Sequence, residues 1–135
     1  MLKVVRGFFE GLATLRKPWR LWIALLGAVN IAAVFFLDTL EGKLVLAAFL
    51  AGVTLQMSIF AVKGYVRLLG IGHILWLPLV LWLGSRLGDI GTESTFGKWV
   101  AAVIVIDGIS AIIDMVDVGR YLAGDRTPAI TLDDV

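Results

Sequence analysis

The chain has 135 residues, of which 59% are hydrophobic, 17% are charged and none is cysteine, and its formal net charge is +1. Because a soluble domain is roughly half apolar and a quarter charged, this composition indicates an integral membrane protein. The lack of cysteine excludes a disulfide framework and a thiolate metal site. The small net charge argues against a nucleic-acid partner, since no basic excess is present to neutralise phosphates.

Residues 1–17 are predicted to form an amphipathic helix on the membrane surface. Its apolar side chains recur at helical spacing, and Lys and Arg lie mostly on the other face. The apolar positions are Leu2, Val5, Phe8, Phe9, Leu12 and Leu15. A helix with one apolar and one charged face is expected to lie in the plane of the interface.

Residues 18–123 are predicted to form a membrane domain with four spans. A spanning helix needs about 20 mostly apolar residues, and four such runs are expected at 19–37, 44–62, 68–85 and 99–117. The runs are continuous rather than alternating, which favours helices over a barrel. We therefore expect an all-α integral membrane protein, a four-transmembrane-helix bundle preceded by an interfacial helix and followed by a polar tail at 124–135.

Two details of this bundle are predicted from local sequence. The connection at 86–98 is expected to be the longest, because it contains several Gly, Ser and Thr residues. Pro78 is expected to kink the third span, as proline does inside a helix.

The distribution of Lys and Arg predicts that both termini lie in the cytoplasm. Nine of the 12 basic residues fall on the side of the termini, and three fall on the other side, at Lys43, Arg86 and Lys98. Cytoplasmic segments carry the basic excess. We expect a bacterial inner membrane as the location.

Small residues in the first two spans predict a helix-contact surface in the lipid bilayer. They are Ala24, Ala28, Ala32, Ala48 and Gly52. Small residues spaced by four let helix backbones approach closely, and packing drives helix association in lipid. The surface serves either the bundle itself or a partner, which would be a second copy of the chain or another membrane subunit.

The fourth span carries a polar stripe on an otherwise apolar helix. Its members are Asp107, Ser110, Asp114, Asp117 and Tyr121. At about 100° per residue, they fall within an arc of roughly 80°. Ionisable groups within a span are costly and are therefore candidates for a site. The stripe is either a structural network that fixes helix packing, a site for protons or cations, or a site for a small molecule.

Depth in the membrane predicts which charged groups meet the stripe. The third and fourth spans are antiparallel, so the start of the third lies level with the end of the fourth. This places Arg67 near Asp117 and His73 near Asp114.

Two amide side chains are predicted at similar depths. Asn30 in the first span lies level with Asp107, and Gln56 in the second span lies between Asp107 and Asp114. Amides form hydrogen bonds between membrane helices, so both are candidate partners of the stripe.

His73 is the single histidine and follows two glycines in the segment Gly-Ile-Gly-His. It is either a hydrogen-bonded residue at the start of a helix or a ligand. As a haem ligand it supplies one axial position, so a bis-histidine haem needs a symmetric dimer or a partner subunit. A metal site made of His73 and Asp114 has too few ligands, and we expect no metal.

The sequence contains no catalytic constellation, since no HExxH, GxSxG or glycine-rich phosphate loop occurs, and we expect no enzyme. The favoured function is a structural or accessory subunit, or a self-associating bundle, in a membrane complex. The alternative is a small oligomeric proton- or cation-coupled transporter or channel that uses Asp107 and Asp114. A second alternative is a protein that binds a lipid, a quinone or haem around His73.

Overall fold

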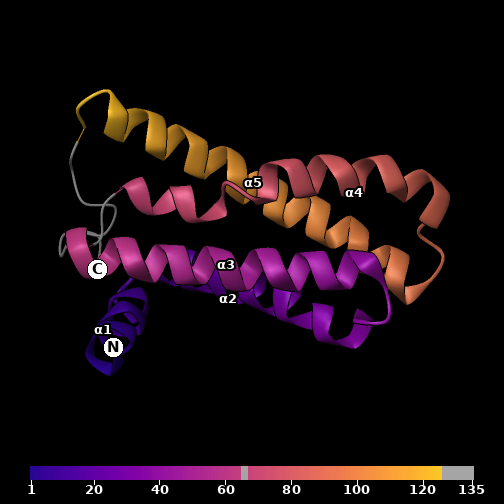
Figure 1. Cartoon of the computed structure of the whole chain (residues 1–135), viewed down its shortest axis with the longest axis horizontal. Helices are drawn as coiled ribbons and strands as arrows, with labels where there is room; N and C mark the ends of the chain where they lie inside the picture. Colours follow the sequence, from indigo (N-terminus) through magenta and orange to yellow (C-terminus); the bar gives the residue numbers. More distant parts are fainter. Residues whose placement is uncertain (65–66, 126–135) are drawn as a thin grey trace.

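The fold of this chain is an all-α bundle of antiparallel membrane helices (Figure 1). The computed structural model describes residues 1–64 and 67–125, and the described residues contain no strand. Four stretches are long and apolar enough to cross a membrane: Lys17–Phe36, Leu40–Lys63, Arg67–Ile90 and Thr95–Leu122. This confirms the predicted fold class. The predicted tail lies outside the described residues from residue 126 onward.

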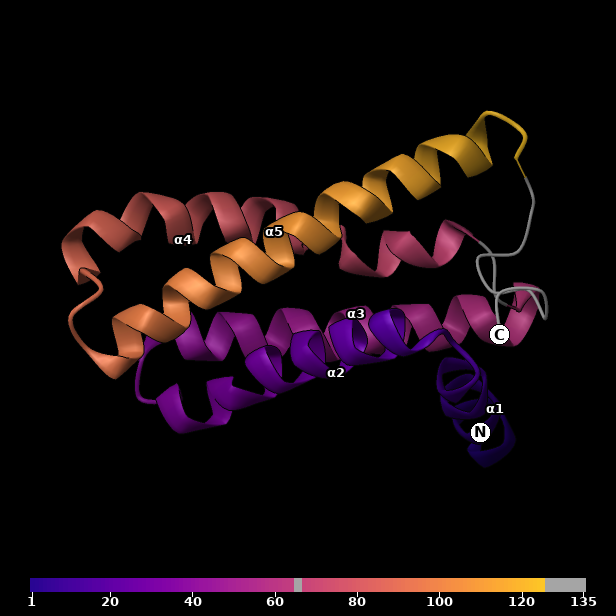
Figure 2. The same ribbon diagram turned by 180° about the vertical axis from the view of Figure 1, so that it is seen from behind.

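Helix α1 (Leu2–Ala13) is a separate element at the end of the bundle that also holds the last turn of the final helix (Figures 1 and 2). Its buried side chain is Phe8, whose ring meets the ring of Phe60 edge to face, with 5.5 Å between centroids. The next helix starts at Lys17 with Pro18 in its first turn, where a missing N–H group costs no hydrogen bond.

The first two spans form a tight hairpin. Helix α2 (Lys17–Ile31) continues as a 3-10 helix, η1 (Ala32–Phe36), and α3 (Leu40–Lys63) begins after a short turn. Thr39 caps α3, because its hydroxyl oxygen accepts a hydrogen bond of 3.0 Å from the backbone N–H of Gly42.

The third span differs from the single kinked helix that the sequence predicted. It consists of a 3-10 helix, η2 (Arg67–His73), and the α-helix α4 (Trp76–Ile90). Pro78 lies in the first turn of α4 rather than inside a continuous helix. A proline ring clashes with the carbonyl four residues earlier in an α-helix, and the change of helix type falls at that residue, Ile74.

The connection between the last two spans is shorter than the predicted loop at 86–98. Helix α4 continues to Ile90, and α5 (Thr95–Leu122) already begins four residues after Gly91. Ser94 caps α5 by accepting a 3.0 Å hydrogen bond from the N–H of Gly97. The predicted span ended at Ser85, before the charged Arg86, but a long basic side chain near a helix end reaches polar groups beyond it.

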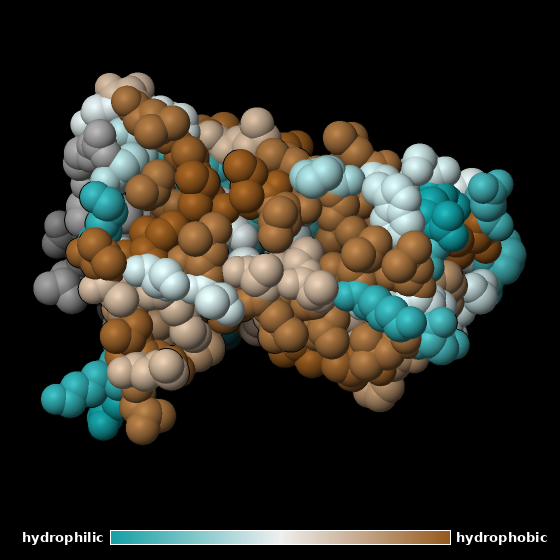
Figure 3. Space-filling view, viewed as in Figure 1, coloured by the Kyte–Doolittle hydropathy of each residue, from teal (hydrophilic) through white to brown (hydrophobic). Residues whose placement is uncertain are grey.

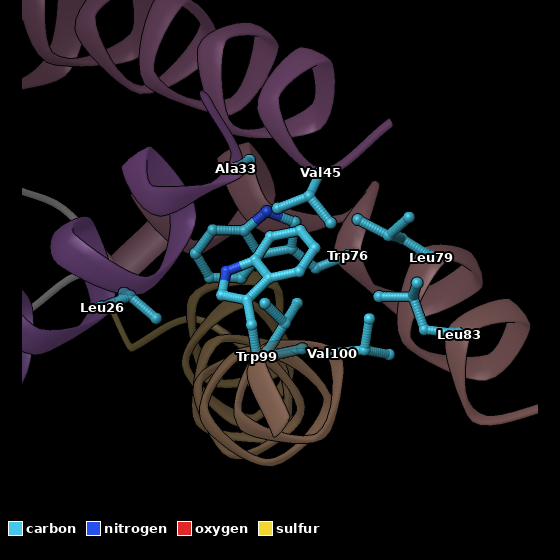
Figure 4. Close-up of a cluster of buried hydrophobic side chains, with 10 residues drawn as sticks. Leu26, Ala33, Val45, Trp76, Leu79, Leu83, Trp99 and Val100 are labelled. Atoms are coloured by element: carbon cyan, nitrogen blue, oxygen red, sulfur yellow. The ribbon is translucent and has the colours of Figure 1, made fainter. Parts of the chain in front are cut away.

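The buried apolar core lies mainly in the half of the bundle that is remote from α1. Figure 4 shows side chains of α2, η1, α3, α4 and α5 converging there. The cluster consists of Leu26, Ala33, Val45, Trp76, Leu79, Leu83, Trp99, Val100, Val103 and Ala111. The face shown in Figure 3 is also largely hydrophobic, and its hydrophilic residues gather mainly toward the ends of the molecule and on α1. This is the surface that a lipid-embedded bundle requires.

Candidate functional site

The polar stripe of α5 faces the interior of the bundle, as its angular spacing predicts. Its five members are buried or partly buried, whereas the opposite face of the helix, with Val105, Ile112 and Met115, is exposed. Helix α5 packs against α2, η2 and α4. The stripe therefore meets side chains from several other elements.

Asn30 and Asp107 form a buried pair between α2 and α5, and both side chains are 0% exposed. The Nδ2 group of Asn30 donates hydrogen bonds to Oδ1 of Asp107, at 2.8 Å, and to the carbonyl of Leu26, at 2.9 Å. Asp107 is about 18 Å along the helix from the start of α5 and about 22 Å from its end. The pair therefore occupies the middle of the span, where the sequence placed both residues.

The Asn30–Asp107 pair leaves two oxygen atoms without a partner. Oδ1 of Asn30 and Oδ2 of Asp107 are both buried and accept no hydrogen bond. An unsatisfied buried acceptor costs about 1–3 kcal/mol, so each of these two oxygens disfavours burial of the pair.

His73 lies between Gln56 of α3 and Asp114 of α5. Its Nε2 atom is 3.1 Å from Nε2 of Gln56, and its Nδ1 atom is 2.5 Å from Oδ2 of Asp114. The imidazole also stacks on the indole of Trp76, with 3.9 Å between centroids. The Asp114 contact is the one predicted from depth, whereas Gln56, which was predicted as a partner of the stripe, contacts His73.

The hydrogen bonds of Gln56 assign the tautomer of His73. Nε2 of Gln56 also lies 3.4 Å from the carbonyl of Leu69, which fixes it as the amide nitrogen and hence as a donor. Nε2 of His73 must then accept, and Nδ1 carries the proton that is donated to Asp114. Because both ring nitrogens are engaged, haem or metal ligation through His73 requires the loss of one of these contacts.

Arg67, the first residue of η2, holds the start of this helix to the C-terminal end of α5. Its Nη1 atom is 2.5 Å from Oδ1 of Asp117, and its Nε atom is 3.5 Å from Oδ2 of Asp125. Asp125 also pairs with Arg120 at 2.9 Å. The Arg67–Asp117 contact is the one predicted from depth.

A close approach of two glycines brings α3 and η2 together. A Cβ atom on Gly52 would lie 2.6 Å from the carbonyl oxygen of Gly72, and one on Gly72 would lie 2.9 Å from that of Gly52. No other residue fits at this distance without a shift of the backbone. The contact aligns Gln56, one turn after Gly52, with His73.

The predicted small-residue surface is divided between two environments. Gly52 is buried, and Ala32 and Ala48 pack against the core. Ala24 and Ala28 lie on the exposed face of α2. Only part of this surface is therefore used inside the chain.

Sequence reasoning missed two polar contacts. The indole Nε1 of Trp22 donates a 3.0 Å hydrogen bond to Oγ of Ser110. At the opposite end of the bundle, Nε of Arg86 is 2.5 Å from Oε1 of Glu41, whose side chain is buried. The same depth argument would have paired Glu41 and Arg86, since they lie at the start of the second span and near the end of the third.

An apolar groove of about 290 Å³ runs between η2, the start of α4 and the second half of α5. Ile71, Leu77, Met115 and Leu122 contribute to its walls, and the His73–Asp114 pair lies along it. Within residues 1–64 and 67–125, no group of three or more His, Asp or Glu side chains is placed to hold a metal ion.

Comparison with known proteins finds no matching family model, no matching curated protein and no matching solved structure.

Proposed function

We propose that this small membrane protein acts as a structural or accessory subunit, or as a self-associating bundle, in a membrane complex. The observation that supports this function is that intramembrane polar side chains form contacts between helices of the same chain. Those of the stripe with assigned contacts pair with another helix of the same chain, such as Asn30 with Asp107 and His73 with Asp114. Such contacts contribute on average about 0.6 kcal/mol each in a bilayer, and they select one arrangement of helices.

The exposed face of α2 is the surface that we assign to a partner. Ala24 and Ala28 are exposed, and a Cβ atom on Gly27 would meet nothing within 4 Å. Such a surface lets another helix approach closely. We place both termini and α1 on the cytoplasmic side of a bacterial inner membrane, in accord with the basic excess at that end.

Native mass spectrometry after gentle extraction from the membrane tests this function. A complex with a different polypeptide supports the accessory subunit, and a defined homo-oligomer supports self-association. Ala28→Leu should weaken either assembly, whereas Ala61→Leu, at another exposed alanine, should not. A chain that is monomeric in every gentle extraction contradicts the proposal.

The second candidate is a small oligomeric proton- or cation-coupled transporter that uses Asp107 and Asp114. It is favoured by the succession of polar groups along α5. Asp107 lies mid-span, the His73–Asp114 pair comes next, and Arg67–Asp117 reaches the end of the bundle that carries α1. These groups lead from the middle of the membrane to one of its faces.

Flux into liposomes tests the transport candidate. Asp107→Asn should abolish flux of protons or monovalent cations while the variant stays folded. Asp89→Asn, at an exposed position near the end of α4, is the matched control and should leave flux unchanged. Flux that persists in Asp107→Asn contradicts a role for this carboxyl group.

A further inference from the structure

The two unpartnered oxygens of the Asn30–Asp107 pair are the two atoms that a second hydrogen bond between an amide and a carboxylic acid would join. A carboxamide and a carboxylic acid join edge to edge through two hydrogen bonds, one N–H to oxygen and one O–H to oxygen. The first of these is present, from Nδ2 of Asn30 to Oδ1 of Asp107 at 2.8 Å. The second would join the two oxygens that lack a partner.

We propose that the Asn30–Asp107 pair is a proton-binding site in the middle of the membrane domain. One proton on Oδ2 of Asp107 supplies the donor that both orphaned oxygens lack. The O–H group donates to Oδ1 of Asn30 and closes a two-point pair between α2 and α5. Release of this proton leaves a carboxylate that is held by a single amide donor.

The charges around Asp107 favour a proton over a carboxylate balanced by a basic side chain. Asp117 forms an ion pair with Arg67, whereas within the described residues Asp107 has an amide donor and no ion pair. A fully buried carboxylate without a charged partner is costly. Protonation removes that charge without any further ligand.

The surroundings also favour a proton over a metal ion. Metal cations such as Ca²⁺ take six to eight oxygen ligands and Mg²⁺ takes six, whereas the described structure places no cluster of acidic or histidine side chains here. Asn30 and Asp107 offer one free oxygen each. A proton needs no more than this.

The elements around the Asn30–Asp107 pair differ in the charge of their polar side chains. Asn30 on α2 and Gln56 on α3 are neutral. The titratable side chains of α4 are Arg86 and Asp89, near its C-terminal end, and those of η2 are Arg67 and His73. His73 is in turn held by Asp114 on α5. The His73–Asp114 pair is therefore the next polar pair between Asn30–Asp107 and the end of the bundle that carries α1.

This inference deepens the second candidate function, because it names the ion and the atoms that hold it. It rests on that candidate only for transport, since a proton can be bound without being moved across the membrane. Binding and flux are therefore measured separately.

Infrared spectroscopy of the protein in lipid bilayers, recorded over a pH series, tests the proposal. The wild-type chain should show the C=O stretch of a protonated carboxylic acid, and raising the pH should remove it reversibly. The band should be missing in Asp107→Asn and kept in Asp114→Asn. A spectrum without an acid band that Asp107→Asn removes would overturn the proposal.

Two variants separate the pairing from a loss of folding. Asp107→Asn should fold, because two carboxamides form the same two-point pair. Asn30→Ala should keep the acid band but shift its frequency, since the N–H donor to the carbonyl oxygen is lost; an unshifted band would overturn the pairing. If the wild-type chain shows the acid band but no proton flux, the proton-binding site is supported and the transport candidate is contradicted. If it shows proton flux but no acid band, the proton-binding site is contradicted.

Discussion

At the residue scale, polar side chains decide which helix faces meet. Lipid tails are as apolar as Leu or Val, so burial alone does not favour one helix contact over another in a bilayer. His73 and Asn30 each have a partner on another helix at a defined depth. A rotation of α5 by one residue, about 100°, would break both contacts, so the stripe fixes the orientation of this helix.

The first prediction concerns the tautomer of His73. Because Gln56 donates to Nε2, the wild-type imidazole should carry its proton on Nδ1. Nitrogen NMR reads this directly, since His73 is the single histidine of the chain. The double variant Gln56→Leu/Asp114→Leu should remove the preference, because each of the two contacts alone favours Nδ1–H, whereas Ser58→Ala, on the exposed side of α3, should preserve it. An Nε2–H tautomer in the wild type would mean that Gln56 presents its oxygen instead.

A second prediction concerns the Glu41–Arg86 pair, whose members differ in exposure. The side chain of Glu41 is 6% exposed and that of Arg86 is 45% exposed. Arg86→Met leaves a buried carboxylate alone and should lower the free energy of unfolding by about 1–3 kcal/mol. Glu41→Gln leaves a cation that water and Trp82 can solvate, and should cost less.

Equilibrium unfolding in mixed micelles measures this difference. Arg6→Met, which breaks the exposed Arg6–Glu10 pair, is the control and should change the free energy of unfolding by at most about 1 kcal/mol. If Arg86→Met and Glu41→Gln lower the free energy of unfolding equally, the burial of Glu41 does not determine the loss of stability.

At the element scale, the hairpin order of the spans made several contacts predictable. Antiparallel neighbours bring the start of one span level with the end of the next, and this rule alone pairs Arg67 with Asp117 and His73 with Asp114. Applied to the other end of the bundle, it would also have found Glu41 and Arg86.

Other features of these elements could not be predicted from hydropathy. The sequence stays apolar across the change from η2 to α4, so hydropathy does not mark it. The position of the change depends on which carbonyl group the ring of Pro78 displaces. The two unpartnered oxygens of Asn30 and Asp107 depend on the directions of individual side-chain bonds. Depth and periodicity carry no information about these directions.

The third prediction compares two helical glycines. Gly→Ala inside a helix usually stabilises it by roughly 0.5–1 kcal/mol, and Gly84→Ala should do so, because its Cβ would meet nothing within 4 Å. Gly52→Ala should instead destabilise the chain, because its Cβ would press on the backbone of Gly72. Thermal unfolding of both variants measures the sign, and stabilisation by Gly52→Ala would contradict the close approach of α3 and η2.

At the scale of the whole molecule, the bundle has two unlike halves. The half near α1 contains the polar contacts of Arg67, His73 and Asp114. The other half is filled mainly by apolar side chains such as Val100 and Leu83, with the Glu41–Arg86 pair at its end. Along α5, the polar stripe therefore leads from Asp107 toward the face that carries α1. For the transport candidate, a path through the apolar half requires a change of structure or a second subunit, which connects that candidate to oligomer formation.

The last prediction concerns the orientation of these halves in the membrane. The chain has no cysteine, so each single-cysteine variant reports one position. Lys3→Cys on α1 and Ala123→Cys after α5 should react with a membrane-impermeant thiol reagent from the cytoplasmic side, because the basic excess lies at that end. Thr92→Cys, in the connection between α4 and α5, should react from the opposite side. Labelling of positions 3 and 92 from the same side would contradict four spans. A reversed pattern would agree with four spans but would place the polar half of the bundle, toward which the stripe leads from Asp107, at the outer face of the membrane.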